Sequence, residues 1–145
     1  MGLFSKLAGL RSAPKKANDE LILVHAMLLM AGVDGYIEDA EIETVEAFVA
    51  TLPEFRDKNF GDMIAEANKL VARYGGLKES VKAVGELSTP ALRRKAFVLA
   101  ADIAMSSGDV DDKEEALLET MQRILDVDSE VADKILEVLS LKYAK

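Results

Sequence analysis

Two stretches of the chain are apolar at almost every position, and each is long enough for about three turns of helix. The first covers residues 21–31 and the second residues 96–105, where Asp102 is the single charged residue. Neither stretch alternates apolar and polar positions as a half-buried strand does. A helix that is apolar on every side is buried all round. The pattern therefore predicts two central helices, both too short for the roughly 18 residues that a membrane span requires.

Five further segments have apolar residues at helical spacing on one face only. They lie at 38–52, 60–74, 77–87, around 117–125 and 129–141. Start and stop signals separate these segments and the two apolar stretches. Asn18 and Thr89 are N-cap candidates, and Pro53 and the Gly75-Gly76 pair end helices. We therefore expect an all-α fold, a compact bundle of about seven helices. Residues 18–145 would form one domain, preceded by a tail at residues 1–17.

Both apolar stretches run into a glycine loop rich in acids, and the two loops are similar in sequence. The first loop spans residues 31–41 and the second residues 104–114. A shift of 73 positions places Gly35 on Gly108 and Glu41 on Glu114. This internal repeat indicates that one helix–loop–helix unit is used twice, at about 20–53 and 93–126.

The charge is unevenly placed along the chain. The net charge of −8 is the sum of +4 in residues 1–16 and −12 in the remainder, which argues against binding to nucleic acid. No cysteine is present, which excludes disulfides and thiolate metal sites. Two interpretations of the basic tail stay open. It forms a short interfacial helix that makes weak contact with an anionic membrane, or it lies against the domain or in solvent.

The acidic loops also allow two interpretations. Glu38 with Glu41, and Asp111 with Glu114, have the spacing of a capping box, in which both acids bond backbone N–H groups at a helix start. Negative charge there is also favoured by the helix dipole. Capping alone accounts for these acids without any ligand.

The second interpretation is a site for a divalent cation of the Ca²⁺ or Mg²⁺ class, because such cations take several oxygen ligands on a tight loop. An EF-hand is not expected, since Met30 and Gly32 stand where its first and third acids should be. Asp102 needs a partner in its apolar helix, either a basic side chain, a helix end or a metal. His25, the only histidine, is interpreted as a core residue. The metal candidates are Asp34, Glu38, Asp39, Glu41, Asp102, Asp109, Asp111, Asp112 and Glu114.

The chain shows no motif typical of an enzyme. It has no phosphate-binding glycine loop, no nucleophile elbow and no histidine paired with an acid in a known motif. We therefore expect a protein that is not an enzyme and has no catalytic residues.

The paired motifs at 33–41 and 106–114 resemble those of the TerB family of tellurite-resistance proteins. Their spacing, the opening Met-Gly-Leu-Phe-Ser-Lys-Leu and the later Asp19-Glu20-Leu21 fit the same family. The resemblance spans essentially the whole chain and implies a compact all-α fold built from a duplicated helical unit. One departure is Ser107, where the family usually has Asp.

The resemblance implies a bacterial protein of the cytoplasm, or of the inner face of the membrane, with a role in tellurite or chemical-stress response. It implies a non-enzymatic, acidic interaction module linked to a divalent cation. The implied partners are other tellurite-resistance and stress proteins and an integral-membrane protein. The alternative is a metal-free, co-chaperone-like or membrane-peripheral scaffold that docks a basic partner.

Overall fold

The computed structural model describes residues 18–35 and 37–145, and every regular element in these ranges is helical. The predicted tail at residues 1–17 lies outside the described residues. The order is α2 (Asp19–Ala31), α3 (Asp39–Val49), η1 (Pro53–Phe55), α4 (Phe60–Arg73), η2 (Glu79–Glu86), α5 (Pro90–Met105), α6 (Asp112–Leu125) and α7 (Ser129–Lys142). The short η1 and the longer η2 are 3₁₀-helices. The prediction of an all-α bundle of about seven helices is confirmed.

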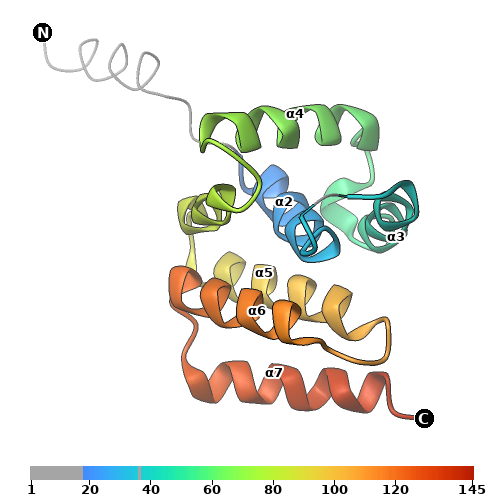
Figure 1. Cartoon of the computed structure of the whole chain (residues 1–145), viewed down its shortest axis with the longest axis vertical. Coiled ribbons are helices and arrows are strands. Elements are labelled where there is room, and N and C mark those ends of the chain that lie inside the picture. The colour runs from blue at the N-terminus through green and yellow to red at the C-terminus, as the bar shows by residue number, and fades with distance from the viewer. Residues whose placement is uncertain (1–17, 36) are drawn as a thin grey trace, which may run out of the picture.

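Helix α2 runs through the middle of the molecule, with α4 on one side and the stack of α5, α6 and α7 on the other (Figure 1). All ten residues from 21 to 30 are buried, as expected for a helix without a polar face. Helix α5 packs along α2 and buries Phe97 and four alanines, which allow the two backbones to approach closely. The two apolar stretches of the sequence therefore form the centre of one connected core.

Side chains predicted to cap helices do so. The Asn18 side chain accepts a hydrogen bond from the Leu21 N–H at 2.7 Å, and Thr89 Oγ1 accepts one from the Leu92 N–H at 3.1 Å. Each bond satisfies a donor that the first turn of a helix leaves free. These caps fix where α2 and α5 begin.

One predicted boundary is wrong. The apolar spacing continues to Leu52, but α3 ends at Val49 with Ala50 as its C-cap. Leu52 has extended backbone (φ −99°, ψ 126°) because a residue before proline is disfavoured in the helical region, and Pro53 follows it. The chain turns here and crosses to α4 through η1.

Arg93 ties the first turn of α5 to two neighbouring elements. Its guanidinium donates to three backbone carbonyl oxygens, at Leu87 (3.2 Å), Gly85 (2.5 Å) and Ile124 (3.2 Å). Carbonyls near the ends of η2 and α6 thus gain donors that their own helices do not provide.

No helix in the described part of the chain is long and apolar enough to cross a bilayer.

Candidate functional site: the paired acidic loops

The first acidic loop connects α2 to α3 and turns at Gly35, whose φ of 111° lies in the region that favours glycine. Asp34 precedes this turn and is exposed. At the start of α3, the Glu41 carboxylate accepts a hydrogen bond from the Glu38 N–H at 2.7 Å. Glu41 is therefore engaged in capping, whereas Asp34 is not.

The second loop connects α5 to α6 and repeats this conformation. Gly108 has a φ of 101°, and Asp111 is the N-cap of α6. The Asp111 side chain accepts from the Glu114 N–H at 2.8 Å, and the Glu114 carboxylate accepts from the Asp111 N–H at 3.0 Å. This is a complete capping box, as the spacing predicted.

The fold brings the two loops together. Lys113 Nζ lies 3.6 Å from Asp34 Oδ1, and this exposed ion pair joins the two loops. Burial raises the pKa of the Glu114 carboxyl, while the hydrogen bond from the Asp111 backbone lowers it. The nearby carboxylates of Asp111 and Asp34 raise this pKa further. The carboxylates of Asp34 and Asp111 therefore both act on Glu114, although Asp34 lies 80 positions before it in the sequence.

Asp102 has a basic partner, one of the alternatives that the sequence left open. Lys142 Nζ lies 2.9 and 3.1 Å from its two carboxylate oxygens, and Tyr143 Oη also donates to it. The side chain of Asp102 is only 14% exposed. Lys142 also lies over the Phe48 ring, at 5.5 Å from its centre. Asp102 thus fastens the end of α7 to α5, and both of its oxygens are occupied, while Lys142 also contacts α3.

The remaining metal candidates lie exposed on the two loops and the helix starts that follow them. Within residues 18–35 and 37–145, no three His, Cys, Asp or Glu side chains converge in a way that could hold a metal ion. Glu38 and Asp39 lie on one loop, and Asp109 and Asp112 lie on the other. The structure places the predicted ligands on adjacent loops, but not around one point. The predicted cation site stays a prediction.

His25 is a core residue. It is 1% exposed, and its Nε2 donates to the carbonyl oxygen of Ser80 in η2 at 3.1 Å. Burial lowers the pKa of the imidazole, and the hydrogen bond to Ser80 opposes this shift. His25 is thus a neutral side chain that joins α2 to η2.

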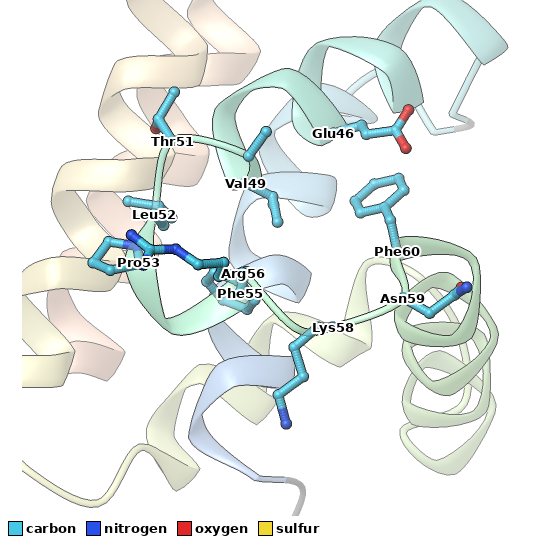
Figure 2. A pocket seen from close by; sticks show the side chains of 11 residues that line it. Glu46, Val49, Thr51, Leu52, Pro53, Phe55, Arg56, Lys58, Asn59 and Phe60 are labelled. Atoms are coloured by element: carbon cyan, nitrogen blue, oxygen red, sulfur yellow. The ribbon is translucent and has the colours of Figure 1, made fainter.

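A hollow of about 700 Å³ that the sequence analysis did not predict lies between the end of α3 and the start of α4 (Figure 2). Its walls combine apolar side chains such as Val49 and Phe60 with the basic side chains of Arg56 and Lys58. These charges do not converge, because Arg56 lies along Pro53 while Lys58 points away. The hollow is therefore a weaker candidate than the paired loops.

The partners of the acidic residues were also missed, since Lys113, Lys142 and Tyr143 meet them only in the folded chain. Their positions in the sequence carry no signal for these contacts, which join residues 40 or more positions apart.

A comparison with protein families matches residues 20–136 to the model described as tellurite resistance protein TerB. The chain belongs to the TerB family. The match extends from the start of α2 into α7 and contains both acidic loops. Comparisons with curated proteins and with solved structures found no match. Membership of the TerB family indicates a role related to tellurite resistance.

Proposed function

We propose that this TerB protein acts in tellurite resistance as a non-enzymatic interaction module, and that its functional surface is the pair of acidic loops. The observation that carries the proposal is the contact between Asp34 and Lys113, two residues that can meet only because the loops are neighbours. Exposed carboxylates on both loops then present one concentrated negative surface. The burial of His25, the only histidine, supports a role without catalysis.

The ligand that we propose for this surface is a divalent cation of the Ca²⁺ or Mg²⁺ class. Such cations bind carboxylate oxygens from several residues, and the carboxylates of Asp34 and Asp111 both raise the pKa of Glu114. Lys113 now lies beside Asp34 and would have to leave it for the cation to enter. Binding would therefore rearrange the loops. Asp111 and Glu114, which cap α6, would give up their hydrogen bonds to backbone N–H groups and bind the cation instead. A partner would recognise the rearranged surface.

Calorimetric titration of the full chain with CaCl₂, MgCl₂ and MnCl₂ tests the cation directly, and thermal unfolding with and without each cation gives the melting temperature. We expect heat of binding and a rise in melting temperature, because a ligand that binds only the folded state stabilises it. Asp34→Asn should abolish both signals without loss of a helix cap. Asp133→Asn, on α7, removes the same charge from an exposed position and should leave both signals intact.

Flat titrations at millimolar concentrations of all three cations would contradict the proposed cation. The metal-free alternative, a co-chaperone-like or membrane-peripheral scaffold, would then use the same acidic surface to dock a basic partner. Its binding should weaken steeply with salt, because it depends on exposed charges. The interaction surface is thus common to both proposals, and only the ligand differs.

A further inference from the structure

An acidic hollow lies at the opposite end of α2 from the paired loops. It has a volume of about 420 Å³ and is formed by the start of α2, the segment 57–59 and the first two turns of α4. Leu21 and Met63 are buried and provide an apolar floor. Asn18, the first described residue, lines the hollow, so the preceding chain enters the domain at this site.

The rim of this hollow is strongly negative. Four carboxylates line it, those of Glu20, Asp57, Asp62 and Glu66, against the single basic side chain of Lys58. Within the described part of the chain, Glu66 has an exposed ion pair with Lys69, whereas the other three carboxylates have no basic partner. The hollow therefore carries negative charge that the folded domain does not neutralise.

The segment that precedes Asn18 has the opposite charge. Residues 1–17 contain Lys6, Arg11, Lys15 and Lys16 and no acidic residue. They also contain Leu3, Phe4, Leu7 and Leu10, apolar side chains that suit the floor of the hollow. At about 3.3 Å per extended residue, Lys15 and Lys16 are within about 10 Å of Asn18, and Lys6 can reach the whole rim.

We propose that residues 1–17 bind in the hollow between α2 and α4 of their own chain. The covalent link gives the segment a high effective concentration at the hollow, so several weak charge pairs are sufficient for binding. The bound segment neutralises Glu20, Asp57 and Asp62 and covers Leu21 and Met63. This contact also withholds the basic residues from anionic surfaces, so the hollow regulates what the segment can bind.

The chain has no cysteine, which makes a site-specific spin label straightforward. Ser5→Cys carries the label, and paramagnetic broadening of backbone amides is measured on the full chain by NMR. We expect strong broadening at Met63 and Glu66. The internal control is Ser88, whose N–H donates to Asp19 at 3.1 Å and which therefore lies near the chain entry but outside the hollow. A segment that is merely tethered broadens Ser88 as much as Met63.

Two further arms test whether charge holds the segment. Glu20→Gln combined with Asp57→Asn, which neutralises two of the carboxylates without a basic partner, should remove the preferential broadening at Met63. The matched variant Glu130→Gln with Glu137→Gln, which removes two charges from exposed positions on α7, should retain it. In the parent chain, 1 M NaCl should also remove it, since the Debye length falls to about 3 Å. The amide spectra show whether each variant is folded, and the salt arm needs no further substitution.

Broadening at Met63 that does not exceed that at Ser88 would overturn the proposal. Preferential broadening that survives both the double neutralisation and 1 M NaCl would overturn it as well, because charge would then not hold the segment.

Discussion

At the residue scale, the polar side chains of His25 and Asp102 lie in the apolar central helices and are stabilised there in different ways. His25 in α2 stays neutral and donates to the carbonyl of Ser80. Asp102 in α5 stays near the surface and is met by Lys142 and Tyr143. A buried polar group costs free energy unless it is hydrogen-bonded, and both are. Each therefore joins two elements of the fold.

His25 predicts a pH dependence of stability. Its pKa is lowered in the folded chain, so below the unfolded value near 6.5 the unfolded chain binds a proton that the folded chain does not. The free energy of unfolding should thus fall as the pH is lowered from about 6.5, by up to about 1.4 kcal/mol per pH unit. Urea unfolding between pH 7 and 5.5 measures the slope. His25→Gln should flatten it, and an unchanged slope in that variant would contradict this account.

Asp102 predicts a specific loss of stability. Asp102→Ala leaves Lys142 and Tyr143 without their acceptor, so we expect a loss of about 1–3 kcal/mol in the free energy of unfolding. Denaturant unfolding measures it. Asp133→Ala, an exposed position on α7, is the control and should change stability by less than about 0.5 kcal/mol. Equal effects of the two substitutions would show that the contact with α7 contributes nothing.

At the element scale, the helices could be predicted from the sequence because their signals are local. Thr89 followed by Pro90 gave the start of α5 correctly, and the Gly75-Gly76 pair lies just after the end of α4. The apolar spacing, with Pro53 as the stop, predicts an end for α3 at Leu52, which is too late because the residue before a proline is itself disfavoured in the helical region. Local patterns therefore located the elements to within a few residues.

The candidate site could be predicted only in part. The capping roles of Asp111 and Glu114 follow from a spacing of three residues, and the structure has both bonds. The approach of Lys113 to Asp34 depends on how α2 and α5 pack together, and no local pattern contains that information. The sequence thus identified the acids and their helix caps, but not their neighbours across the fold.

The capping box predicts a measurable contribution to stability. Asp111→Ala removes the acceptor for the Glu114 N–H, so we expect a loss of about 1 kcal/mol in the free energy of unfolding. Asp112→Ala, at the next position, removes a first-turn acid without removing the cap and should cost less. Thermal or urea unfolding of both variants provides the comparison. A larger loss for Asp112→Ala would contradict the capping role of Asp111.

At the scale of the whole molecule, the bundle acts as a support that holds two acidic loops side by side. The central pair α2 and α5 ends at these loops, so the packing of the core fixes their relative position. The charge of −12 outside residues 1–16 favours the cation or the basic partner that we propose as the ligand. Membership of the TerB family indicates a role of the protein related to tellurite resistance.

The most direct test of this account is tellurite survival in cells that depend on this protein for resistance. Asp34→Asn with Asp109→Asn neutralises one exposed acid on each loop and removes no helix cap. We expect this variant to be present at the parent level but to lose resistance, whereas Glu130→Gln with Glu137→Gln on α7 should retain it. Full resistance in the loop variant, at equal protein level, would contradict the claim that the paired loops are the functional surface.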